Sequence, residues 1–170
     1  SADKPGKING RVRLTSPHKD STTTATGNDR LVLRGQVQAD GIRFESIAKV
    51  EATSGAVSTT GDQLEITNAD QVLIRLVAAT NFTNFRDITG DPAARSAKFM
   101  ENASGKPWDK LLSTHLADHQ SLFRRMDIDL GNSPESLRPT HERIVDYLKG
   151  QDPQLAALTF QYGRYLLIGS

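Results

Sequence analysis

The tightest group of possible metal ligands in the 170-residue sequence consists of His115, Asp118 and His119. Residues i and i+4 of a helix face the same way, so the two histidines could hold one ion together. No glutamate follows His115 to act as a base, and both histidines fall on an apolar helical stripe. We therefore expect these histidines to pack in the core or against the linker, and we predict no metal ligand.

Four aspartates could supply a carboxylate pair: Asp87, Asp91, Asp127 and Asp129. Hydrolysis of a glycosidic bond needs a general acid and a second carboxylate held several ångströms apart. Asp91 stands where a helix N-cap is expected, and Asp127 and Asp129 alternate with apolar residues as the outward side of an extended stretch. Solvated, structural roles are favoured for these residues, and no catalytic residue is assigned.

Three aromatic residues, Phe82, Phe85 and Trp108, could form a platform on which a sugar stacks. Trp108 also falls on the apolar stripe of a helix, and a core position is the favoured interpretation for it. Asn81 and Asn102 begin N-glycosylation patterns, which remain unassigned because so short a pattern arises often by chance.

The composition excludes several other classes of function. Lys and Arg number 21 and Asp and Glu 20, and neither sign forms a block, so nucleic acid and anionic membranes are not predicted partners. The chain has no cysteine, which excludes disulfides and thiolate chemistry. Its apolar stretches are too short to cross a bilayer.

Short apolar runs separated by turn residues extend from Lys7 to about Phe85 and predict antiparallel strands. Turns are predicted at Gly27-Asn28 and at Thr60-Gly61-Asp62. Residues 42–53 have period two: one face carries mostly apolar side chains, and the other carries Arg43, Glu45, Ile47 and further polar residues. We expect the first face to be buried and the second to be solvated. Residues 72–79 are apolar at nearly every position and are predicted to be covered on both faces.

A helical half follows the strands. Asp91-Pro92 and Asp152-Pro153 each pair an acidic N-cap with a proline at the first helical position. These pairs predict helices over about 93–103 and 153–168, and spacings of three and four residues predict a long, well-packed helix over about 107–126. Residues 127–140 are predicted to be loop, and Thr140 is expected to cap a short helix.

The segment 115–131, HLADHQSLFRRMDIDLG, resembles the linker signature of glycoside hydrolase family 95. In that signature His-x-x-Asp-Tyr-x-x-Leu-Phe-x-Arg precedes a Leu-Gly ending. The resemblance continues through residues 139–143, 152–158 and, most specifically, 160–168. The end of the family's N-terminal β-domain is similar to residues 33–35, 41–44, 78–87 and 90–92.

Two histidines depart from the family pattern. His119 stands where the family usually has tyrosine, so it is expected to replace a packing residue. His141 stands where an acidic residue is common, and no role is carried over to it.

The resemblance implies an α+β chain: part of an antiparallel β-sandwich followed by α-helices, which form a linker and the first helix of an (α/α)6 barrel. The implied division is 1–86 for the β-sandwich, 87–150 for the helical linker and 151–170 for the first helix of a truncated catalytic barrel. An apolar helix such as 153–168 also needs a large partner surface, so we expect further chain to follow it.

The implied activity is removal of terminal α-L-fucose, α-1,2-linked, with inversion, by a glycosidase whose general acid is a glutamic acid. The family's catalytic motifs follow the 160–168 run and are absent here, so the chain itself is predicted to be inactive. The implied partners are a fucosylated oligosaccharide or glycan and the remainder of the same polypeptide, without a cofactor, and a periplasmic or secreted location is favoured. A carbohydrate-binding or interaction module without catalysis is the alternative.

Overall fold

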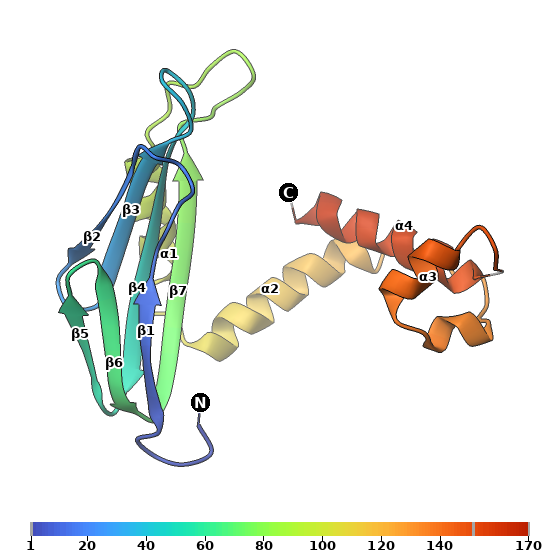
Figure 1. The fold of residues 1–170 in the computed structure, drawn as a ribbon, viewed down its shortest axis with the longest axis horizontal. Helices are drawn as coiled ribbons and strands as arrows, with labels where there is room; N and C mark the ends of the chain where they lie inside the picture. Colours follow the sequence, from blue (N-terminus) through green and yellow to red (C-terminus); the bar gives the residue numbers. More distant parts are fainter. Residues whose placement is uncertain (1, 151, 170) are drawn as a thin grey trace. The chain divides into compact units, whose positions relative to one another are not determined.

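The computed structural model describes residues 2–150 and 152–169. The chain clusters into two compact units that divide between Lys106 and Pro107. The first unit contains seven strands and helix α1, and the second contains the remaining helices (Figure 1). No helix among the described residues is long and apolar enough to cross a membrane.

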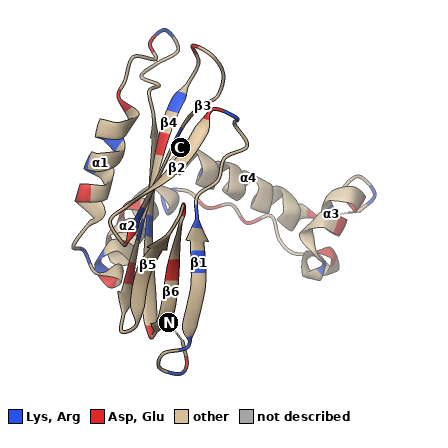
Figure 2. Ribbon diagram, turned by 60° about the vertical axis from the view of Figure 1, so that its left-hand side comes forward, with Lys and Arg blue, Asp and Glu red and all other residues tan. Residues whose placement is uncertain are grey.

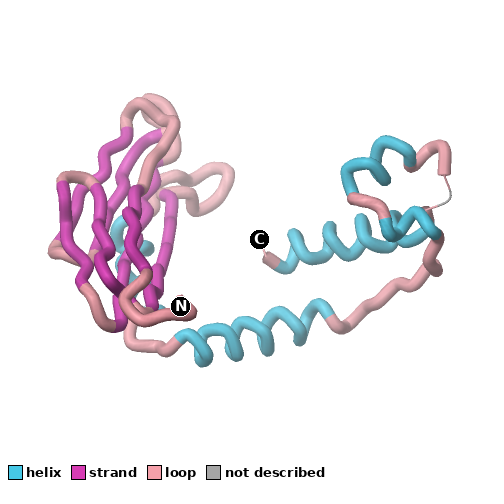
Figure 3. The backbone as a smooth tube through the Cα atoms, turned by 60° about the horizontal axis from the view of Figure 1, so that its bottom comes forward, coloured by secondary structure: helices cyan, strands magenta, loops and turns pink. Residues whose placement is uncertain are grey.

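The strands form two antiparallel sheets, as the sequence predicts (Figure 3). A three-stranded sheet has the order β1-β6-β5, and a four-stranded sheet has the order β2-β3-β4-β7. The strands are β1 (Ile8–Arg13), β2 (Ser21–Thr26), β3 (Arg30–Gln36), β4 (Arg43–Thr53), β5 (Ala56–Thr60), β6 (Gln63–Ala69) and β7 (Gln71–Thr80). The predicted turns at Gly27 and Gly61 join β2 to β3 and β5 to β6, and both glycines have positive φ.

One core lies between the two sheets. Leu31 and Val50 from the four-stranded sheet pack with Leu64, Ile66 and Ala69 from the three-stranded sheet, and all five are buried. Because side chains alternate along a strand, the inward positions of β4 are the even-numbered ones, which include Ala48 and Val50. The predicted β-sandwich is confirmed.

Helix α1 (Pro92–Ala103) covers the opposite face of the four-stranded sheet (Figure 2). Its position overturns one expectation about β4. The odd-numbered face of β4 was predicted to be solvated, but Glu45 and Ile47 on it are buried. Ser96 donates a hydrogen bond to the Glu45 carbonyl at 3.3 Å, and Met100 packs against Val32 and Ile47. The face therefore carries a second, smaller core beneath the helix.

The expectation that β7 is covered on both faces is wrong. Its inward residues Ile74 and Leu76 are 50% and 63% exposed. The reason is that β7 is the edge strand of the four-stranded sheet, and the facing sheet has one strand fewer. On the other face Arg75 is buried, where it binds Glu51 and donates to the Lys106 carbonyl at 2.8 Å.

The second unit consists of α2 (Trp108–Phe123), the 3-10 helix η1 (Pro134–Leu137), α3 (Thr140–Asp146) and α4 (Pro153–Ile168). The predicted N-cap of α4 is confirmed, since Asp152 accepts from the Leu155 amide at 3.0 Å. The predicted cap at Thr140 is wrong, because α3 starts at Thr140 and Pro139 precedes it without a side-chain cap. Part of the predicted loop 127–140 forms η1.

Helix α2 also departs from the expected packing. It contains no buried residue, and Trp108, expected in the core, is 58% exposed. The apolar stripe predicted for this helix is present, and α4 contacts it within the second unit, yet this contact leaves the stripe largely exposed. Periodicity identifies the helix and its apolar face without showing how much of that face a partner covers.

Candidate functional site

The histidines of α2 pack within an aromatic cluster. The His119 ring lies 5.2 Å from the ring of Phe123 and 5.8 Å from that of Tyr165 on α4, and His115 lies 6.0 Å from His119. No group of three or more metal-binding side chains gathers among residues 2–150 and 152–169. The rings of Phe123 and Tyr165 around His119 show that this side chain packs as an aromatic residue would.

Each of the four aspartates considered for catalysis is engaged in local backbone structure. Asp91 caps α1 by accepting from two amides, at 2.9 and 3.1 Å, and Asp129 accepts from the Gly131 amide at 2.8 Å. Asp127 accepts from the Ile128 amide at 3.0 Å and also from the Gln161 side chain at 2.8 Å. Asp87 accepts from the hydroxyl and amide of Thr89, and these bonds lower the pKa of its carboxyl. A glycosidase general acid needs a raised pKa, so this environment opposes that role.

The aromatic residues proposed as a sugar platform divide between the units. Phe82 and Phe85 lie in the exposed loop between β7 and α1, where Arg86 stacks over the Phe85 ring at 4.9 Å. Trp108 begins α2 in the second unit. The first glycosylation pattern is also engaged: Asn81 is 2% exposed and its Nδ2 donates to the Ile88 carbonyl, which shields this nitrogen in the folded chain.

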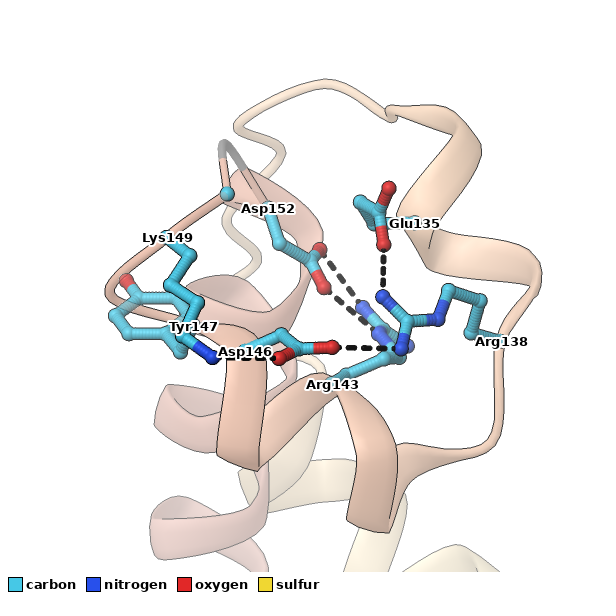
Figure 4. Close-up of a pocket in the computed structure, with 8 residues that line it drawn as sticks. Glu135, Arg138, Arg143, Asp146, Tyr147, Lys149 and Asp152 are labelled. Atoms are coloured by element: carbon cyan, nitrogen blue, oxygen red, sulfur yellow. Dashed lines mark hydrogen bonds and ion pairs between the residues drawn. The ribbon is translucent and has the colours of Figure 1, made fainter.

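A charged pocket lies in the second unit, between η1, α3 and the start of α4 (Figure 4). Arg138 forms ion pairs with Glu135 at 2.6 Å and with Asp146 at 2.8 Å. Arg143, 5% exposed, forms a two-pronged pair with Asp152 at 2.8 and 2.9 Å. Each guanidinium is thus neutralised inside the pocket.

The pKa shifts in this pocket follow from the ion pairs. Hydrogen bonds from Arg143 lower the pKa of Asp152, and a hydrogen bond from Arg138 lowers the pKa of Asp146. Both carboxyls therefore stay ionised at neutral pH and are poor proton donors. The pocket acts as a junction: Asp152 binds Arg143 on α3 and caps α4 at once.

A second junction joins α2 to α4. The Arg164 guanidinium on α4 donates to the carbonyls of Phe123 and Met126, each at 2.6 Å, where α2 has just ended. A cation placed at these carbonyls also interacts favourably with the negative end of the helix dipole. Arg164 lies over the Phe123 ring as well, at 4.9 Å. Its role is to fix two helices rather than to bind a ligand.

An apolar groove of about 550 Å³ separates α3 from α4. Ile144 and Tyr147 form one side, and Leu155, Ala156 and Phe160 form the other. The polar groups among these side chains are the hydroxyls of Tyr147 and Thr159, and the Thr159 hydroxyl donates to the Leu155 carbonyl at 2.8 Å. The groove offers packing surface and no acid or base.

Two family models match the chain in the order of its two units. Residues 1–85 match the N-terminal domain of glycosyl hydrolase family 65, and residues 107–170 match the catalytic domain of glycosyl hydrolase family 95. Alpha-L-fucosidase 2 from Arabidopsis thaliana is 30% identical in an alignment of 202 residues that covers 99% of this chain.

The chain belongs to glycoside hydrolase family 95. Two proteins named probable alpha-fucosidase A are also similar. That of Aspergillus niger is 35% identical over 81 residues, covering 47% of this chain and 10% of its own length. That of Aspergillus oryzae is 26% identical over 154 residues, covering 81% of this chain and 21% of its own length. The chain spans about a quarter of the Arabidopsis relative, 24% of its length.

Sequence reasoning identified the family 95 segments at 139–143 and 152–158 but missed the ion pair between them. The available signal was an arginine on a short helix followed nine residues later by an aspartate at an N-cap. Such an aspartate keeps a second oxygen that can bind a guanidinium. Sequence spacing does not show whether the arginine points inward.

Proposed function

We propose that the polypeptide carrying this chain is an α-L-fucosidase-type glycosidase, which removes terminal α-1,2-linked L-fucose with inversion. The observation that carries the proposal is the 30% identity with alpha-L-fucosidase 2 over 99% of the chain. Two further relatives carry the name probable alpha-fucosidase A. The proposed substrate is a fucosylated oligosaccharide or glycan.

Within that enzyme, the proposed role of residues 1–170 is scaffold. Inverting glycosidases need a protonated acid on one side of the scissile bond and a base for water on the other. Asp87, Asp91, Asp127 and Asp129 are all engaged in local hydrogen bonds, and the pKa of Asp87 is lowered by its bonds to Thr89. This supports placing the reacting carboxyls elsewhere in the polypeptide, so that the chain alone is inactive.

The proposed scaffold has three parts, residues 1–86, 87–150 and 151–170, as sandwich, linker and first barrel helix. The match of the catalytic-domain model to residues 107–170 supports a barrel role for α4. Helix α1 lies near the start of the proposed linker and packs on the four-stranded sheet. This part of the linker therefore covers the sandwich.

The test compares the 170-residue chain with the longer polypeptide on 2′-fucosyllactose, with an α-galactoside as the matched control substrate. Proton NMR should show β-fucose as the first product of the longer polypeptide, since inversion converts the α-linkage to the β-anomer. The short chain should release no fucose. Turnover by the short chain would overturn the scaffold role, and preferred cleavage of the galactoside would overturn the substrate assignment.

A module without catalysis is the second candidate, favoured by the exposed apolar residues of α3 and α4. Ile144, Val145 and Leu148 on and after α3, and Tyr162 and Leu166 on α4, are all exposed. Such a surface suits a protein partner. Absence of turnover by the longer polypeptide on either glycoside would favour this candidate.

A further inference from the structure

Two adjoining hollows lie in the first unit, at the edge where β3 ends and β4 begins. One, of about 440 Å³, extends toward β2 and the start of α1, and the other, of about 450 Å³, extends toward the loop 81–91. Gln36 and Arg43 line both hollows. Each volume falls in the range of about 300–1,000 Å³ typical of small-molecule sites.

The hollows offer hydrogen-bond donors that the described part of the chain leaves unused. Arg43 is exposed, and its guanidinium makes no hydrogen bond or ion pair with residues 2–150 and 152–169. Arg34 binds Glu45 through Nε at 2.6 Å, which leaves its two terminal nitrogens without a partner among the same residues. The backbone amide of Gln36 donates to the backbone carbonyl of Asp20. Donors therefore converge from two neighbouring strands.

Carboxylate acceptors stand around these donors. Asp91 accepts both α1 amides through Oδ1, so Oδ2 remains for a ligand. Asp20 is exposed beside the first hollow and Asp40 beside the second. Glu45 is 3% exposed and is held by Arg34. The site thus presents donors and acceptors together.

The walls of the hollows are fixed before any ligand arrives. Asn81 holds the loop 81–91 to β4 by accepting from the Arg43 amide at 2.9 Å. Arg95 binds the carbonyls of Thr80 and Phe82 at 2.9 and 2.6 Å. A Cβ at Gly90 would lie 2.9 Å from the Asn81 carbonyl oxygen, a backbone atom, so glycine is needed for this approach. A site held in this way loses little conformational entropy on binding.

The charges decide the class of ligand. Four carboxylates and two guanidinium groups line the two hollows, but Glu45 is already paired with Arg34 and Asp91 already caps α1. An anion therefore meets the carboxylates of Asp20 and Asp40, and a cation meets the Arg43 guanidinium. A hydroxyl group both donates and accepts, and it can bind a carboxylate and a guanidinium at the same time. We propose that the hollows centred on Arg43 form a binding site for a neutral oligosaccharide, with adjoining sugar units in the two hollows. This site lies in the sandwich and needs no hydrolysis, so it goes beyond the proposed activity.

Binding is tested on the 170-residue chain with the neutral trisaccharide 2′-fucosyllactose, by NMR titration of the backbone amides. We expect saturable shifts at Gln36, Arg43 and Thr89 with a Kd on the order of 1 mM. Arg43→Ala should weaken binding about tenfold, because it removes charge-assisted hydrogen bonds. Its fold should persist, because the Arg43 side chain is exposed and its backbone bonds to Asn81 remain.

Arg11→Ala is the matched control: Arg11 is an exposed arginine on the three-stranded sheet, paired with Glu65 at 3.2 Å, and it should leave affinity unchanged. Shifts that fail to saturate, or equal affinity in the Arg43→Ala variant, would overturn the site. Inorganic phosphate that binds there more tightly than the trisaccharide would overturn the neutral class. A failure here is separate from a failure of the proposed hydrolysis, which is measured as fucose release by the longer polypeptide.

Discussion

Asn81 ties the loop 81–91 to β4 through two side-chain hydrogen bonds of opposite sense. Oδ1 accepts from the Arg43 amide at 2.9 Å, and Nδ2 donates to the Ile88 carbonyl at 2.6 Å. The side chain is fully enclosed. Asn81→Asp preserves the shape and the first bond, but it replaces the donor with an oxygen that faces the Ile88 carbonyl.

The magnitude follows from these two bonds. Loss of the donor, with the Ile88 carbonyl left unpaired, costs about 1–3 kcal/mol. Burial of the introduced carboxylate raises its pKa, and each unit of that rise adds about 1.4 kcal/mol when the group is ionised. We expect Asn81→Asp to lower the free energy of unfolding by about 3 kcal/mol at about pH 7.

The penalty should depend on pH with a definite sign. The folded-state pKa of the introduced carboxyl lies above its unfolded-state value, so the penalty is complete above the folded-state pKa. It shrinks as the pH falls toward the unfolded-state value of about 3.9, because a neutral carboxyl can donate to the Ile88 carbonyl. Asn81→Ala removes both bonds without adding charge and should cost about 2–4 kcal/mol, independently of pH.

The assay is urea unfolding followed by far-UV circular dichroism from about pH 4.5 to about pH 8, with hydrogen exchange measured over residues 81–91. Asn84→Asp is the matched control, because Asn84 is exposed in the same loop and its Oδ1 accepts from the Arg86 amide, which a carboxylate also does. It should change stability by less than about 0.5 kcal/mol. A deficit in Asn81→Asp that does not shrink on acidification would refute the reasoning.

Three further predictions test other parts of the fold. Met100→Ala should lower the free energy of unfolding by about 2–5 kcal/mol in urea, because it empties the core beneath α1. Gly55→Ala should cost about 2 kcal/mol or more and Gly61→Ala about 1 kcal/mol, because both have positive φ but only at Gly55 would a Cβ collide with the Thr67 carbonyl. Acidification should reduce the helical signal of the second unit. Because the pKa of Asp152 is lowered in the folded chain, its carboxylate stabilises the fold fully above the unfolded-state pKa of about 3.9. This stabilisation is lost as the pH falls through the folded-state pKa. Asp152→Asn should give a weaker helical signal at neutral pH and a smaller loss across this acid range, in which the Asp146 carboxyl paired with Arg138 still titrates.

The parts of the fold that the sequence predicts correctly depend on neighbours in the chain. Asp91 and Asp152 cap helices by binding amides two or three residues away, and the residue types at these positions are enough to identify them. The period-two pattern of 42–53 identifies β4 and its inward face. The turns at Gly27 and Gly61 are local in the same sense.

The parts that the sequence predicts wrongly depend on contacts between distant residues. Glu45 lies opposite the predicted core and was expected in water, but Ser96, 51 residues later, reaches its carbonyl from α1. The hollows beside it likewise combine residues of β2, β3, β4 and the start of α1. Alternation shows which side chains share a face, and it does not show which element covers that face.

The two units differ in how much of their apolar surface they enclose. The first encloses Leu31, Val50 and Leu64 almost completely between its sheets, which suits a unit whose core is largely its own. Among the described residues of the second unit, Leu155 and Ala157 are the buried hydrophobic residues, and the apolar groove beside α4 remains open. Helices with so much exposed apolar surface gain their stability by packing against further elements. The catalytic-domain match over these same residues supports the proposal that other parts of the enzyme supply that cover, and substitutions in α3 and α4 should then affect the barrel more than the sandwich.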